Sequence, residues 1–335
     1  MCIKINFKRF FKRIFPCLRE RPEPIADIPE PPPELILPEP EPFCFFGCSV
    51  YELIQQNVKG VEDFLGDLRL AGGNATEIFL VHSLNGNIFQ PYVFDSYVNK
   101  YDLTAWNTFF WVDFKYFLRK CKELGIVPFI RIHDQCSVKN PEWNKFYCFM
   151  NNVQGFTDVY DDRLYPFYSR LNKRILKELR DVGIKKYFII PMNECDGKNT
   201  EVYRFNIWYV NDLLSSNVSE DQIIISADSK HLVRLKDLGC RYEAHDIASR
   251  NELVAAREIY DVPLFPNGDG CHGKGICSWN GYCEPSPAQF KLLSEYIKTN
   301  DLFGYCYKAR RAYLTKGEVH LELVKFRALK ALTGK

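Results

Sequence analysis

The sequence predicts a parallel α/β barrel of eight strand–helix units, a (β/α)8 TIM barrel, preceded by a basic helix and a linker rich in proline and glutamate. Three helical patterns end in a glycine, within Glu123–Ile126, Asp181–Ile184 and Asp237–Cys240, and a strand-like apolar run follows each of them. Glycine closes a helix in the left-handed conformation, so each joint is typical of a helix that leads directly into a buried strand. The strand candidates are nearly continuous apolar runs, as expected of parallel strands covered on both faces.

Eight such strands can be placed along the chain. They are Phe43–Val50, Glu77–His82, Val127–His133, Tyr187–Asn193, Gln222–Ala227, Arg241–Ile247, Pro263–Asn267 and Leu302–Tyr307. Helical patterns lie between them, for example at Tyr168–Leu179 and Pro287–Lys298. Eight units in about 290 residues suit a barrel of ordinary size. A doubly wound open sheet is the alternative, but Phe46–Ser49 lacks the repeated glycines of a phosphate-binding loop.

The chain before the barrel divides into two regions of different composition. Residues 1–20 carry six Lys or Arg, with phenylalanines at helical spacing between them. This pattern predicts a basic amphipathic helix that binds an anionic membrane surface or an assembly partner, and a disordered basic tail is the alternative. Residues 21–42 contain nine Pro and six acidic residues, which predicts an extended spacer because proline fixes φ and removes backbone donors. Residues 43–335 then form the barrel domain.

Composition excludes several classes of protein. The formal net charge is +2, so no global field attracts nucleic acid, and we expect no nucleic-acid partner. The 13 cysteines are an odd number, and most lie on apolar stretches, which favours buried reduced thiols. No apolar run approaches the ~18 residues of a membrane-spanning helix, and no signal-peptide pattern is visible.

Polar side chains gather where the predicted strands end. In a parallel barrel the carboxyl ends of all strands meet at one mouth, where the chemistry takes place. The residues at these ends are His82, Arg131–Asp134, Asn193–Glu194, Glu243–Asp246 and Asn267–Gly270. The joint pattern predicts an active site there.

Three of these strands carry a family resemblance. Phe188–Glu194 resembles the fourth strand of clan A glycoside hydrolases, the cellulase- and mannanase-like retaining enzymes, in which an Asn-Glu pair ends the strand. Ile130–Asp134 resembles their third-strand motif, and Tyr242–Asp246 resembles the sixth-strand motif with a histidine in the substrate cleft. The resemblance covers residues 43–310 and implies hydrolysis of a poly- or oligosaccharide with retention, without a metal or organic cofactor.

The resemblance also implies roles for individual residues. Glu194 would be the general acid/base, and Asn193 would bind the sugar 2-hydroxyl. The family places its nucleophilic glutamate at the end of strand seven, where this chain has Gly268; the nearest carboxylate is Asp269, and Glu284 is a second candidate. The substrate cleft would be lined by His133, His245, Tyr305 and Trp279. If the nucleophile is missing, the alternative is a non-catalytic glycan-binding barrel or the receptor-binding head of a surface or virion attachment protein.

The loop after the seventh strand is rich in cysteine. The loop offers four soft ligands that could hold a tetrahedral Zn²⁺, although it has no C-x2-C pair; they are Cys271, His272, Cys277 and Cys283. A disulfide with one spare thiol and three free cysteines are the alternatives. Trp279 would either stack on a sugar or pack the loop itself.

Overall fold

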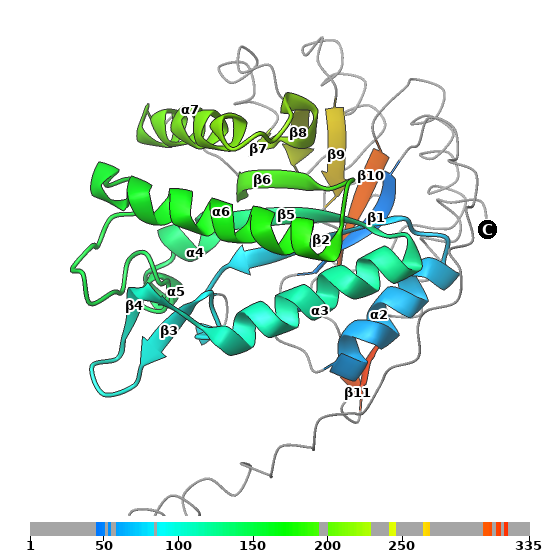
Figure 1. Ribbon diagram of the computed structural model, residues 1–335, viewed down its shortest axis with the longest axis horizontal. Helices are drawn as coiled ribbons and strands as arrows, with labels where there is room; N and C mark the ends of the chain where they lie inside the picture. Colours follow the sequence, from blue (N-terminus) through cyan, green and yellow to red (C-terminus); the bar gives the residue numbers. More distant parts are fainter. Residues whose placement is uncertain are drawn as a thin grey trace, which may run out of the picture. The chain divides into compact units, whose positions relative to one another are not determined.

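The computed structural model of the chain shows the strands of the predicted barrel domain and the helices that connect the first five of them (Figure 1). It describes residues 45–50, 53–54, 58–83, 86–193, 200–228, 241–245, 264–268, 304–309, 313–315 and 318–320. Side chains are described for residues 53–54, 59–83, 86–193 and 200–226. The predicted basic segment and linker, residues 1–42, lie outside these ranges.

Eight strands form one sheet in which every pairing is parallel. The strands are β1 (Phe45–Val50), β2 (Ala75–Val81), β5 (Val127–Asp134), β6 (Phe188–Asn193), β7 (Ile224–Asp228), β8 (Arg241–His245), β9 (Leu264–Gly268) and β10 (Gly304–Ala309). Their order is β6-β5-β2-β1-β10-β9-β8-β7. Ile189 of β6 also forms a parallel bridge with Ile223, the residue before β7, which links the two ends of this order.

Each of the eight predicted strands overlaps one observed strand. The ends differ by at most two residues: β2 begins at Ala75 rather than Glu77, and β10 ends at Ala309 rather than Tyr307. The predicted α/β class with parallel strands is therefore confirmed. Continuous apolar runs identified these strands because both faces of a parallel sheet are buried.

Four long helices connect the first five strands of the sheet. They are α2 (Val58–Leu70), α3 (Thr108–Leu124), α6 (Tyr165–Val182) and α7 (Thr200–Ser215). Gly125 ends α3 with φ 64° and Gly183 ends α6 with φ 76°, and both donate their N–H to carbonyls of the last turn. These left-handed caps confirm the predicted helix ends. The predicted glycine joint at 237–240 and the predicted helix at 287–298 lie outside the described residues.

Several short elements were not predicted from the sequence. The hairpin β3 (Tyr92–Asp95) and β4 (Lys100–Trp106) lies between β2 and α3, and a second hairpin pairs β11 (Tyr313–Thr315) with β12 (Glu318–His320). The short helices are α4 (Gln135–Lys139), α5 (Pro141–Asn144) and the 3₁₀ turns η2 (Asp162–Leu164) and η3 (Glu220–Gln222). Among the helices that are described, none combines the length and the apolar composition needed to cross a membrane.

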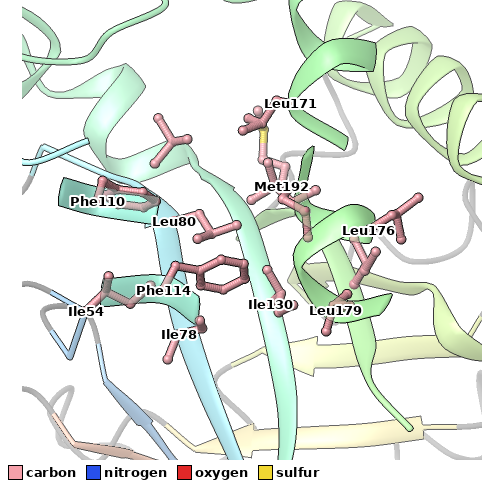
Figure 2. Close-up of a cluster of buried hydrophobic side chains, with 14 of the residues drawn as sticks. Ile54, Ile78, Leu80, Phe110, Phe114, Ile130, Leu171, Leu176, Leu179 and Met192 are labelled. Carbon is pink, nitrogen blue, oxygen red and sulfur yellow. The ribbon is translucent and has the colours of Figure 1, made fainter. Parts of the chain in front are cut away.

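Strands β2, β5 and β6, whose side chains are described, are buried on both faces and carry an apolar cluster on each. On one face Ile78, Leu80 and Ile130 pack against side chains of the covering helices, and Figure 2 shows them with Phe114 of α3 and Leu179 of α6. On the other face a smaller cluster is formed by Ala75, Phe129, Phe188, Ile190 and Ile224. Ile189 belongs to the first cluster and its neighbours along β6 to the second, as the alternation of side chains along a strand requires.

Candidate active site

A buried arginine joins four neighbouring strands inside the sheet. Arg131 of β5 is fully buried and forms an ion pair with Glu77 of β2, with Nη2 and Oε2 2.8 Å apart. Its Nη1 donates to Asn193 Oδ1 of β6 at 2.6 Å and to Ser226 Oγ of β7 at 3.2 Å. A buried guanidinium is tolerated only when its donors are paired, and these acceptors supply that pairing.

Asn193 lies at the carboxyl end of β6 and is held from two sides. Its Oδ1 accepts from Arg131, and its Nδ2 donates to Asp134 Oδ1 at 3.1 Å. The side chain is fully buried. A reversed amide would place its NH₂ against the guanidinium and its oxygen against the carboxylate, so these two partners fix the orientation of the carboxamide.

Asp134 ends β5 and begins α4. Its Oδ2 accepts from the backbone N–H of Ser137 at 2.9 Å and from Ser137 Oγ at 2.7 Å, so it is the N-cap of the helix. Ser137 Oγ accepts in turn from the backbone N–H of Ser83, two residues after β2. The carboxylate therefore joins the ends of three adjacent strands, β2, β5 and β6.

His133 is enclosed by aromatic side chains. Its Nδ1 lies 2.7 Å from the Tyr147 hydroxyl and its Nε2 lies 3.1 Å from the Tyr209 hydroxyl. The ring also makes edge contacts with Tyr168 of α6 and Phe205 of α7. Burial lowers the pKa of His133 from 6.5 to about 3, so the ring is neutral at pH 7. This position gives His133 a structural role between β5 and two helices, and its contact with a substrate stays a prediction.

The structure places two further predicted cleft residues by their backbone. His245 is the last residue of β8, beside Asp228 at the end of β7, as expected for a residue at the mouth. Tyr305 is the second residue of β10, beside Phe46 of β1, and the strand continues to Ala309. Tyr305 therefore lies nearer to the amino end of its strand than to the end where β8 places His245.

The remaining predicted site residues lie outside the described part of the chain. They are Glu194, Asp269, Glu284, Trp279, Cys271, His272, Cys277 and Cys283. The zinc, disulfide and free-thiol alternatives for the seventh loop stay open. Within the described ranges, no three His, Cys, Asp or Glu side chains are grouped so that they could hold a metal ion. The thiols of Cys121 and Cys148 are buried and outside any disulfide.

Sequence reasoning singled out the motif Arg131–Asp134 but missed Glu77 as the partner of its arginine. The available signal was a charged residue in the middle of an apolar strand, since Glu77 stands between Thr76 and Ile78 in a fully buried run. A charge in such a place needs an opposite charge nearby. The sequence does not say which of the 44 Lys and Arg residues supplies it.

Comparison with known proteins identifies the fold by structure rather than by sequence. No protein-family model matches the chain, and no curated protein matches its sequence. An endo-1,4-β-mannanase from Rhizomucor miehei superimposes with a TM-score of 0.59 at 12% identity, over 89% of this chain and 96% of that one. A family 5 xyloglucanase from Paenibacillus pabuli gives 0.55 at 10% identity, over 87% and 98%. An endo-β-1,4-mannanase from Thermotoga petrophila gives 0.54 at 11% identity, over 88% and 77%.

These structures are TIM-barrel glycosidases of clan A, and the chain resembles them in fold. The resemblance first indicated by three strand motifs is therefore found again over most of the chain.

Proposed function

We propose that the chain is a retaining glycoside hydrolase built on a complete (β/α)8 barrel, with Glu194 as its general acid/base. One observation carries the proposal: Asn193 ends the fourth strand of an eight-stranded parallel sheet, buried and hydrogen-bonded on both sides of its carboxamide. Clan A enzymes, which the fold resembles, place an Asn-Glu pair at this point, and Glu194 follows Asn193 directly in the sequence. The bridge between Ile189 and Ile223 supports closure of the sheet into a barrel.

The proposed mechanism follows from the chemistry of the glycosidic bond. Its oxygen is a poor leaving group, so Glu194 would protonate it as the bond breaks and would later activate the attacking water. Asn193 would bind the sugar 2-hydroxyl, a contact that strengthens as the ring becomes oxocarbenium-like. A second carboxylate would form the glycosyl-enzyme, with Asp269 as our first choice and Glu284 as the second. The mechanism needs no metal ion and no organic cofactor.

The proposed substrate is a β-linked polysaccharide. The structural neighbours include enzymes named for β-1,4-mannan and xyloglucan, and these two polymers are the first substrates to test. His245, at the end of β8, is proposed to contact the sugar, and Trp279 is a proposed aromatic contact.

Hydrolysis of a glycan panel tests the function. The purified chain should release reducing ends from mannan or xyloglucan, and proton NMR should show that the first product keeps the anomeric configuration of the substrate. Glu194→Gln should lower turnover by about 10²- to 10⁴-fold because Gln cannot donate the proton. Glu142→Gln, on the exposed helix α5, is the matched control and should leave turnover unchanged. A parent protein that binds one of these glycans and releases no sugar would instead support the non-catalytic alternative.

A further inference from the structure

Asn193 is buried, and the described residues use only part of the hydrogen-bonding capacity of its carboxamide. A carboxamide has two N–H donors and two acceptor lone pairs. Among the described residues, Asn193 uses one N–H on Asp134 and one lone pair on Arg131. Its second N–H is therefore the donor that remains for a ligand at the end of β6.

We propose that Asp134 is a positioning residue, which holds the Asn193 carboxamide so that Asn193 presents its remaining N–H to the substrate. The predicted effect on hydrolysis rests on the proposed function, because it can be measured only if the chain cleaves glycosides. In this arrangement a sugar hydroxyl accepts from Asn193, and the orientation is set before the substrate arrives. Asp134 itself does not touch the sugar.

Asp134 is suited to this role because it is itself fixed. Two donors of Ser137 hold Oδ2, at 2.9 Å and 2.7 Å, which leaves Oδ1 directed at Asn193. Ser137 is fully buried and tied to the end of β2 through the backbone N–H of Ser83. A hydrogen bond to a carboxylate is stronger than one between neutral groups, so the Asp134 partner constrains the amide more than a neutral acceptor would.

Arg131 completes the orientation from the opposite side. Glu77 accepts from Nε at 3.1 Å and from Nη2 at 2.8 Å, so the plane of the guanidinium is fixed and Nη1 remains directed at Asn193. Rotation of the Asn193 amide would break both charge-assisted bonds at once. An active-site amide held in this way needs no reorganisation when charge develops on the substrate.

The test compares substrates that differ only at the sugar 2-position. We would measure kcat and KM on 2,4-dinitrophenyl β-D-mannoside and β-D-glucoside. Because these sugars differ only in configuration at carbon 2, a single 2-deoxy glycoside serves as the 2-deoxy analogue of both. Asp134→Asn should lower kcat on the 2-hydroxy glycosides by about 10- to 100-fold, because the Asn193 amide then keeps only one of its two charged partners, Arg131, and is held less firmly. On the 2-deoxy glycoside the variant and the parent should differ by less than about 3-fold, since the contact that Asp134 positions is absent. An equal loss on all three glycosides would overturn the inference and would indicate a structural role only.

Two further variants keep the test decisive. Ser137→Ala keeps the backbone donor to Asp134 but removes the hydroxyl donor, so it should show the same substrate pattern with a smaller loss. It replaces Asp134→Asn if that variant does not fold. Asp161→Asn is the matched control, because Asp161 also caps a helix turn but forms its hydrogen bonds with Arg163 rather than with Asn193, and it should leave all three rates unchanged.

A second readout does not depend on hydrolysis. In protein labelled with ¹⁵N-asparagine, the side-chain NH₂ of Asn193, assigned by its loss in Asn193→Ala, should show one strongly deshielded proton that Asp134→Asn removes and Asp161→Asn retains. If the parent cleaves no glycoside, the proposed function fails and this resonance alone decides the inference. An Asn193 resonance that is the same in the parent and in Asp134→Asn would overturn it.

Discussion

Glu77 and Arg131 form an ion pair in which both side chains are buried, one on β2 and the other on β5, 54 residues apart in the sequence. Neither charge can be satisfied by water at this depth, so the pair forms only when the two strands are side by side. Through Arg131 it also orients Asn193, which connects the stability of the sheet to the geometry of the proposed active site.

Breaking this pair should strongly destabilise the fold. Glu77→Gln leaves the guanidinium without its carboxylate, and we expect it to lower the free energy of unfolding by about 3–5 kcal/mol. Urea denaturation followed by circular dichroism measures this change. Glu142→Gln, which removes the exposed partner of Lys145, should leave the denaturation midpoint unchanged. A Glu77→Gln midpoint equal to that of the parent would mean that the pair is not buried in solution.

His133 should make stability depend on pH below neutrality. Its pKa is about 3 in the folded protein, against the ordinary value of 6.5 that an unfolded chain retains, so between these values the unfolded chain binds a proton that the folded protein does not. The contribution is fully present above pH 6.5 and is lost as pH falls, by up to about 1.4 kcal/mol per pH unit.

His133→Gln keeps a donor and an acceptor but cannot titrate. The free energy of unfolding measured at about pH 7 and about pH 4.5 should therefore differ less in this variant than in the parent. Equal pH dependence in the two proteins would show that His133 is not buried as a neutral ring.

Two glycines should respond to the same substitution with opposite sign. Gly125 ends α3 with φ 64°, so Gly125→Ala strains the backbone and should destabilise the protein by about 1–2 kcal/mol although no atom blocks the new Cβ. Gly66 lies inside α2 with equally open space, so Gly66→Ala should stabilise it by about 0.5–1 kcal/mol. Thermal unfolding of the two variants measures both effects. A Gly125→Ala variant more stable than the parent would contradict the left-handed cap, and a destabilised Gly66→Ala would contradict a regular helical position for Gly66.

The nucleophile can be assigned by comparing two carboxylates. If Asp269 forms the covalent intermediate, Asp269→Asn should reduce hydrolysis at least as severely as Glu194→Gln, because no glycosyl-enzyme can form. Glu284→Gln should then retain activity. The reverse result, an active Asp269→Asn and an inactive Glu284→Gln, would move the nucleophile to Glu284 and leave the enzyme assignment intact.

Limited proteolysis tests the predicted organisation. The proline- and glutamate-rich segment at 21–42 cannot bury enough apolar surface to fold, so a protease should remove residues 1–42 first and leave a stable core. Mass spectrometry of the fragments locates the cuts. A first cut within residues 150–193, which the structure places in helix α6, strand β6 and the segments beside them, would contradict a single barrel domain.

The sequence by itself determined the strands of the sheet and two of the helix ends. Runs such as Phe188–Asn193 are apolar throughout because a parallel strand is covered on both faces, and Gly125 and Gly183 mark helix ends because few other residues adopt positive φ. These are local properties, so they can be read from neighbouring residues. The Asn-Glu pair was found in the same way, since it follows directly from the end of a strand.

Only the tertiary structure decided what the polar side chains contact. Because side chains alternate along a strand, Arg131 and His133 of β5 are expected on the same face of the sheet. In the structure, however, Arg131 contacts side chains of neighbouring strands, whereas His133 contacts aromatic rings of α6 and α7. The partners of Arg131 and of Asn193 lie between 54 and 95 residues away along the chain. Such contacts depend on which strands become neighbours and on how helices close over them, and no local pattern of residues encodes either.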